Sequence, residues 1–236
     1  MEINRMAIAS FHALIAEDEI NVYRSLKGYL EDQFYKINIF HGNSVVNCRS
    51  IVQSLAENDV FLDLAILDFG LVDETSNVFC CEIRDYVPII HYTGYPKELD
   101  VVAVDEHMKE KHPQDRQFGL PSHDAVLVDK NDDDWVRQIA DLTRPIYQMK
   151  INERILNSVQ LLGEASCASK RTPESRRIGR IASSSLTGFM NTLHRDIADV
   201  WPILTDKVKA AVHDRFGVET DPKDGQITRL KLFKNE

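Results

Sequence analysis

Over its first 150 residues, this chain alternates between short apolar runs and longer amphipathic stretches. Alternation of this kind is typical of a parallel β-sheet with helices packed on both faces. We expect five strands, at residues 12–17, 36–41, 63–68, 87–92 and 124–129. The first part of the chain is therefore predicted to be a doubly wound α/β domain.

Helices are expected to follow these strands. Apolar residues at helical spacing follow the first strand at Val22, Leu26, Tyr29, Leu30 and Phe34. A second such series follows the second strand at Val45, Val46, Cys48, Ile51, Val52 and Leu55. The segment between residues 95 and 123 is longer than one helix requires, so we expect a helix near 97–110 and then an irregular insertion.

The chain after the fifth strand has a helical pattern over residues 131–162, interrupted by Pro145. Residues 165–177 have the composition of a linker, and two amphipathic helices then follow over 186–200 and 204–216, the second capped by Gly217. A turn and a short terminal strand end the chain. We place the domain boundary at Pro145, which gives a domain over 1–145 and a mainly helical module over 146–236.

The two parts of the chain also differ in net charge. Residues 1–150 hold 14 Lys and Arg against 26 Asp and Glu, a net charge of −12, whereas residues 151–236 hold 14 against 11, a net charge of +3. The acidic first part argues against nucleic acid as its ligand and is compatible with a carboxylate-rich cation site. The mildly basic second part leaves a polyanionic partner open.

The four cysteines, Cys48, Cys80, Cys81 and Cys167, show no CxxC spacing. This usage is typical of a reducing compartment. The N-terminal residues do not resemble a signal segment, and no apolar stretch approaches the roughly 20 residues that a membrane span needs. We expect a soluble, cytoplasmic protein that does not contact a membrane.

Reactive side chains follow four of the predicted strands. They are Glu17, Asp18 and Glu19 after the first, Asp68 at the end of the third, Thr93 after the fourth and Lys130 after the fifth. In a doubly wound sheet, ligands bind at the edge where the carboxyl ends of the strands meet. Carboxylates gathered there suit Mg²⁺, and an ionised Asp68 beside the ion could attack an activated phosphoryl group while Lys130 offsets the charge.

These motifs, in this order, resemble the receiver domain of two-component response regulators over residues 12–142. LIAEDE resembles the acidic end of the family's first strand, and LAILDFGLVD resembles its phosphoacceptor strand. PIIHYTGY resembles the fourth strand, and AVLVDK resembles the lysine-bearing fifth strand. The resemblance implies a flavodoxin-like fold.

The resemblance also implies a role for each matching residue. The implied ligands of Mg²⁺ are the side chains of Glu17, Asp18 and Asp68 and the backbone carbonyl of Gly70. Asp68 would accept the phosphoryl group, Thr93 would be the switch hydroxyl, and Lys130 would bind the phosphate. The chain would then be a phosphoacceptor switch and not an enzyme, with at most self-phosphorylation from small donors and autodephosphorylation.

Four features depart from the family pattern. Asn131 stands where a proline is usual, and VDETS replaces the glycine-containing turn after Asp68. The interval from Thr93 to Lys130 is longer than the family's norm, and Leu127 occupies the place of an aromatic residue. The atypical loops after Asp68 and Lys130 favour an alternative, a receiver-like protein that no longer cycles phosphate and acts as a constitutive interaction or assembly module. A DNA-binding transcription regulator is a third interpretation. The Trp201–Pro202 turn does not resemble a helix-turn-helix, although the terminal strand could form a wing.

The expected phosphodonor is a histidine kinase or a phosphotransfer protein. Two amphipathic helices offer too little surface to bury each other's apolar stripes, so the C-terminal module is expected to need a further surface. A homodimer through the C-terminal helices or a partner protein would supply it, and nucleic acid is the least expected partner.

Overall fold

The computed structural model describes residues 9–73, 76–94, 125–168, 189–223 and 226–232. Phe11–Tyr147 form one compact unit. The described residues after Tyr147, together with Ala9 and Ser10, form a second unit. Among the helices of these segments, none is long and apolar enough to cross a bilayer.

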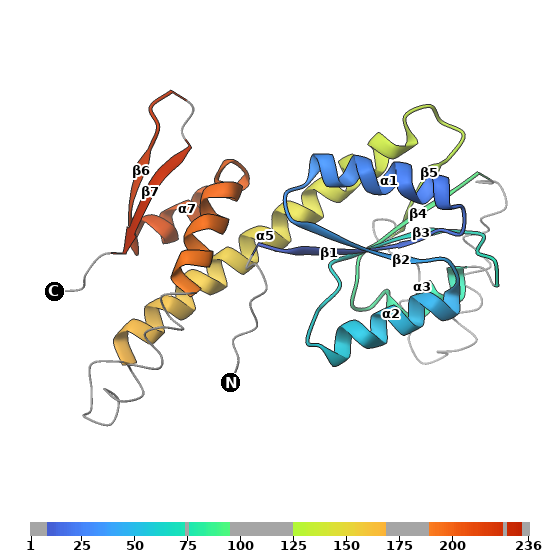
Figure 1. Ribbon diagram of the computed structural model, residues 1–236, viewed down its shortest axis with the longest axis horizontal. Helices are drawn as coiled ribbons and strands as arrows, with labels where there is room; N and C mark the ends of the chain where they lie inside the picture. The colour runs from blue at the N-terminus through green and yellow to red at the C-terminus, as the bar shows by residue number, and fades with distance from the viewer. Residues whose placement is uncertain (1–8, 74–75, 95–124, 169–188, 224–225, 233–236) are drawn as a thin grey trace, which may run out of the picture. The chain divides into compact units, whose positions relative to one another are not determined.

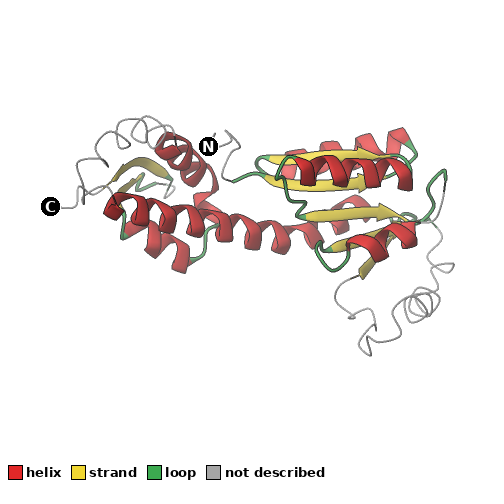
Figure 2. Cartoon of the chain, turned by 90° about the horizontal axis from the view of Figure 1, so that it is seen from below, coloured by secondary structure: helices red, strands yellow, loops and turns green. Residues whose placement is uncertain are grey.

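The first unit contains a five-stranded parallel sheet, as predicted. Its strands are β1 (Phe11–Ala16), β2 (Ile37–Gly42), β3 (Leu64–Asp68), β4 (Ile89–Thr93) and β5 (Ala125–Asp129), in the order β2-β1-β3-β4-β5. Each predicted strand is confirmed to within two residues at either end. Figure 2 shows these strands lying between two layers of helices.

The two central strands explain why the sequence shows apolar runs and not a period of two. Every residue of β1 and of β3 is buried, because helices cover both faces of the sheet. The register places Ala16 opposite Leu67 and Thr93 opposite Asp129. The residues that directly follow β1 and β5 therefore lie beside the ends of β3 and β4.

Helices α1 (Ile20–Gln33) and the start of α5 (Trp135–Ala168) cover one face, and α2 (Val45–Glu57) and α3 (Ser76–Ile83) cover the other (Figure 1). The ring of Tyr147 packs against Phe11 and Phe34, with centroids 5.4 Å and 5.1 Å away. Val45 and Cys48 define the buried side of α2. Val46 was predicted to join them but is 66% exposed, since one residue further along a helix turns the side chain by about 100°.

The predicted interruption at Pro145 is wrong, because α5 continues through this residue. Proline removes one backbone donor from a helix. The buried side chains of Ile139, Thr143 and Tyr147 lie on both sides of Pro145 and keep this part of α5 packed on its unit. The helix also includes residues 165–168 of the predicted linker. The rest of that linker and the helix expected over 97–110 lie outside the described residues.

The second unit contains the later part of α5, a helix described over 189–200, a 3₁₀ turn (Trp201–Ile203) and α7 (Asp206–His213). An antiparallel hairpin of β6 (Phe216–Thr220) and β7 (Ile227–Leu232) follows. The amphipathic helices and the terminal strand were predicted. Phe216 and Gly217 were not placed correctly, because they belong to β6 and not to the end of a helix.

Buried apolar side chains from three helices contribute to the interior of this second unit: Ile155 and Val159 of α5, Leu193, Ile197 and Val200 of the helix over 189–200, and Val208 and Val212 of α7. Asn152 of α5 joins the turn before α7 to this core. Its Nδ2 donates to the carbonyl of Ile203 at 3.2 Å, and its Oδ1 accepts from the backbone N–H of Thr205 at 2.7 Å. A single buried side chain thus satisfies two backbone groups of an irregular turn.

Candidate functional site

The ends of β1, β3 and β5 bring one lysine and two carboxylates together. Lys130 Nζ lies 2.8 Å from Glu17 Oε2 and 2.7 Å from Asp68 Oδ2. The backbone N–H of Lys130 donates to the carbonyl of Thr93 at 2.8 Å, which fixes the start of the lysine side chain at the sheet edge. Residues separated by more than 100 positions in sequence are joined here because the strands are parallel.

Glu17 is fully buried and has three hydrogen-bond donors around it. Its Oε2 accepts from Lys130 and from the hydroxyl of Tyr92 at 2.7 Å, while its Oε1 accepts from the backbone N–H of Glu19 at 3.0 Å. Tyr92 was not among the predicted site residues. The available signal was a hydroxyl-bearing side chain inside an apolar run, directly before Thr93.

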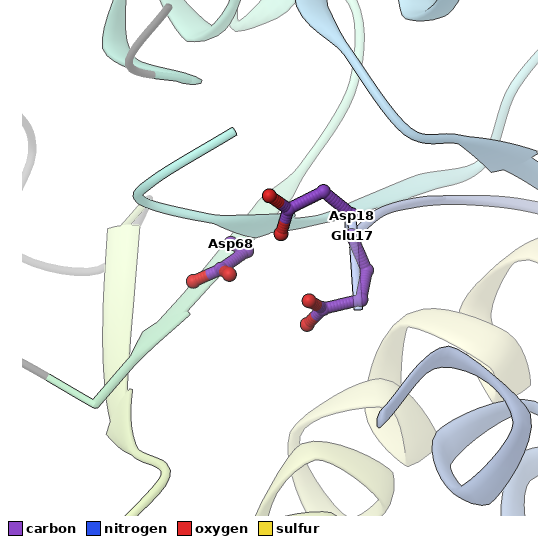
Figure 3. A group of neighbouring side chains, drawn as sticks. All are labelled: Glu17, Asp18 and Asp68. Carbon is purple, nitrogen blue, oxygen red and sulfur yellow. The ribbon is translucent and has the colours of Figure 1, made fainter. Parts of the chain in front are cut away.

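The carboxylates of Glu17, Asp18 and Asp68 can face a common ion, since one oxygen from each lies within 4.8 Å of the others. Figure 3 shows the three side chains extending from neighbouring strand ends toward the same region. A carboxylate has about four lone-pair sites, so three donors leave Glu17 one of them. Asp18 is exposed. This donor set fits a hard cation such as Mg²⁺, which retains several waters as ligands.

Burial is the largest influence on Asp68, and it raises the pKa of this carboxyl from 3.8 to about 6. Lys130 opposes this shift, and the charge of Glu17 adds to it. Burial lowers the pKa of Lys130, but its hydrogen bonds to Asp68 and Glu17 outweigh that effect and the pKa rises overall. The lysine is therefore a fixed positive charge beside a carboxylate that ionises near neutral pH.

Sequence comparison and structural comparison give different results. No protein-family model matches this chain, and no curated protein matches it. The receiver domain of the TMAO respiratory system response regulator TorR is similar, with 23% identity, a TM-score of 0.41, and coverage of 58% of this chain and 98% of its own. A CheY-like receiver domain protein from Methanospirillum hungatei JF-1 is also similar, with 16% identity, a TM-score of 0.42, and coverage of 61% and 98%. The Mn²⁺-bound form of response regulator Rcp1 shows 17% identity, a TM-score of 0.43, and coverage of 56% and 91%.

The strand order of the first unit, with all five strands parallel and helices on both faces, is the flavodoxin-like order that CheY shares. The described residues between 11 and 147 therefore have the flavodoxin-like fold. In a sheet of this order, ligands bind at the carboxyl ends of β1 and β3, where the strand order reverses direction. Glu17, Asp18 and Asp68 all lie at that edge.

The two other predicted site residues, Thr93 and Gly70, lie near this edge. Thr93 is the last residue of β4 and is 2% exposed. Gly70 lies exposed, two residues after Asp68, and a side chain there would meet no atom within 4 Å. The role implied for Gly70 thus concerns its backbone carbonyl and not a need for a small side chain.

The loops that depart from the receiver family pattern have structural contacts of their own. Asn131 Nδ2 donates to the carbonyl of Gly94 at 2.8 Å and to Asp129 Oδ1 at 2.8 Å. In the loop after β3, the carboxylate of Asp73 accepts from the first two backbone N–H groups of α2, at 2.9 Å and 3.1 Å. Both replacements attach a site loop to a neighbouring element.

Proposed function

We propose that this chain is a response regulator that accepts a phosphoryl group on Asp68 and signals through its C-terminal module. The observation that carries the proposal is the contact of Lys130 Nζ with Asp68 Oδ2 at 2.7 Å, beside the carboxylates of Glu17 and Asp18. A nucleophile, a fixed cation and a cation site at one sheet edge are the groups that phosphoryl transfer to a carboxylate requires.

In the proposed step, a carboxylate oxygen of Asp68 attacks the phosphorus of a phosphohistidine in a histidine kinase or phosphotransfer protein. An O–P bond forms and the P–N bond breaks. The imidazole nitrogen keeps the electron pair of that bond, and a proton on the ring's second nitrogen lets the ring leave as neutral imidazole. When bound, Mg²⁺ supplies positive charge for the phosphoryl oxygens.

Lys130 and Thr93 each have a part in this step. Lys130 holds Asp68 in place beforehand and donates to a phosphoryl oxygen afterwards, because its ammonium has three donors. The hydroxyl of Thr93 is proposed to bond a phosphoryl oxygen after transfer. The chain forms and loses its own acyl phosphate and transforms no separate substrate, so it acts as a switch and not as an enzyme.

Intact-mass spectrometry of the full chain with acetyl phosphate and Mg²⁺ tests the proposal. We expect a single phosphoryl adduct in the wild type, none in Asp68→Asn, and an unchanged adduct in the exposed control Asp85→Asn. Lys130→Ala should slow adduct formation, whereas Thr93→Ala should leave it intact and weaken the response. A wild type without an adduct, or an adduct that persists in Asp68→Asn, would favour the constitutive interaction module instead.

The proposed output is association of the C-terminal module with a second copy or with a partner protein. Met149 and Leu161, both in the part of α5 that belongs to the second unit, are 55% and 60% exposed. Light scattering of the full chain with and without beryllofluoride measures whether the phosphorylation mimic changes the molecular mass. Leu161→Glu should reduce any association that depends on this helix, and a mass unaffected by both changes would contradict the proposed output.

A further inference from the structure

Tyr92 lies in the core of the receiver domain and contacts two residues of the acidic site, Glu17 and Lys130. Its side chain is fully buried, and its hydroxyl donates to Glu17 Oε2 at 2.7 Å. Lys130 Nζ lies 4.7 Å from the centre of its ring. The ring of Tyr92 is also stacked on the ring of Trp135, with centroids 5.7 Å apart and an angle of 4° between the planes.

These contacts make Tyr92 sensitive to the charge on Asp68. Glu17 Oε2 is shared between the Tyr92 hydroxyl and Lys130, and the same ammonium bridges to Asp68 Oδ2. An acyl phosphate on Asp68 replaces the charge of the carboxylate with the larger negative charge of a phosphoryl group, and it presents new oxygens to Lys130. The ammonium then bonds Glu17 less, and the tyrosine hydroxyl becomes the side-chain donor on which the Glu17 carboxylate depends.

Trp135 connects the Tyr92 ring to helix α5. It is the first residue of α5, and this helix continues to Ala168, beyond the limit of the receiver domain at Tyr147. A flat stacked contact is sensitive to small displacements, because aromatic pairs have preferred offsets. A shift of the Tyr92 ring therefore acts on the first turn of the helix that enters the C-terminal module.

We propose that Tyr92 is a positioning residue that transmits the state of the Glu17–Lys130–Asp68 cluster to α5 through its stacked contact with Trp135. The inference rests on the proposed function, since it assumes that Asp68 accepts a phosphoryl group. It adds a residue and a direction of transmission that the phosphoacceptor chemistry does not itself require. If Tyr92 only filled the core, the environment of the Trp135 ring would not change when a group binds to Asp68.

The test is tryptophan fluorescence of the full chain, titrated with beryllofluoride in the presence of Mg²⁺, with bound beryllofluoride followed separately by ¹⁹F NMR. We expect a fluorescence change on binding that is lost in Trp135→Phe, although Trp201 remains. In Tyr92→Phe, which keeps the ring and removes the hydroxyl, the change should be smaller than in the wild type at equal bound beryllofluoride. The exposed control Tyr86→Phe should give the full wild-type change.

The outcomes separate the inference from the proposed function. Bound beryllofluoride that leaves the fluorescence unchanged, a change that survives in Trp135→Phe, or a full change in Tyr92→Phe overturns the inference alone. Wild-type protein that binds no beryllofluoride overturns the proposed function. If Tyr92→Phe does not fold, the comparison of wild type with Trp135→Phe still decides whether α5 senses the site.

Discussion

Replacing Asp68 with asparagine should stabilise the folded protein at neutral pH when no divalent cation is present. Burial raises the pKa of this carboxyl from 3.8 to about 6, despite the ion pair with Lys130. The folded chain therefore prefers the neutral form of the side chain more than the unfolded chain does. Asparagine resembles that neutral form in size and shape, and Lys130 keeps its contact with Glu17.

The size of the effect follows from the shift of the pKa. Each unit corresponds to about 1.4 kcal/mol, so a shift from 3.8 to about 6 gives an upper value near 3 kcal/mol. Partial contact with water reduces this figure, and we expect Asp68→Asn to raise the free energy of unfolding by about 1–3 kcal/mol at pH 8. Below pH 3.8 both states of the wild type hold the proton, so the two proteins should be equally stable. Between pH 3.8 and about 6 the unfolded wild type ionises first, and its stability falls relative to the variant.

Urea unfolding in EDTA, followed by tryptophan fluorescence at pH 4 and pH 8, measures this difference. The matched control is Asp85→Asn, because Asp85 is exposed and its ion pair with Arg84 is long at 3.8 Å. The control should change stability by less than about 0.5 kcal/mol at both pH values. Asp68→Asn that is less stable than the wild type at pH 8, or a difference that is the same at both pH values, would refute the reasoning.

Three further substitutions test the packing around the site and the second unit. Gly42→Ala would place a Cβ in steric conflict with Cys48 Sγ and 3.3 Å from the Cys48 backbone N, so thermal unfolding should show a loss of about 1–3 kcal/mol. Asp73→Ala removes the acceptor for two N–H groups of α2 and should cost about 1 kcal/mol in a urea titration; a neutral result would show that water replaces it fully. Asn152→Ala should cost about 1–3 kcal/mol and accelerate hydrogen exchange at Thr205, and unchanged exchange there would contradict the role given to this side chain.

The strands were predictable because a parallel sheet covered on both faces requires runs of apolar residues, and β1 and β3 are such runs. The positions of Glu17, Asp68, Thr93 and Lys130 at the carboxyl ends of β1, β3, β4 and β5 were predictable because each residue ends an apolar run or directly follows one. The interruption predicted at Pro145 was wrong, because packing that the local sequence does not reveal offsets the cost of a proline inside the helix. Strand β6 was missed for a similar reason, because its partner β7 lies beyond a turn.

Tyr92 is a residue of the site that the sequence analysis did not predict. Its hydroxyl donates to a carboxylate 75 residues earlier in the chain, and the only local signal was a hydroxyl-bearing side chain in an apolar run before Thr93. Asp73 and Asn131 were visible only as departures from the family pattern. Their hydrogen bonds with α2 and with Gly94 depend on the tertiary fold, so these contacts could not be predicted from the spacing of residues in the sequence.

The anchoring of the loop after Asp68 has a consequence for ligand affinity. The Asp73 carboxylate is bound to the start of α2, and the backbone N–H of Ser76 donates to the carbonyl of Phe69 at 3.0 Å. Freezing one free backbone residue costs about 1–2 kcal/mol of conformational entropy. The hydrogen bonds of Phe69 and Asp73 hold this loop at both ends in the folded protein, so part of that entropy is lost during folding. A phosphoryl group or a cation arriving at Asp68 would then have less of the loop to order, and more of the favourable energy of its contacts would remain as affinity.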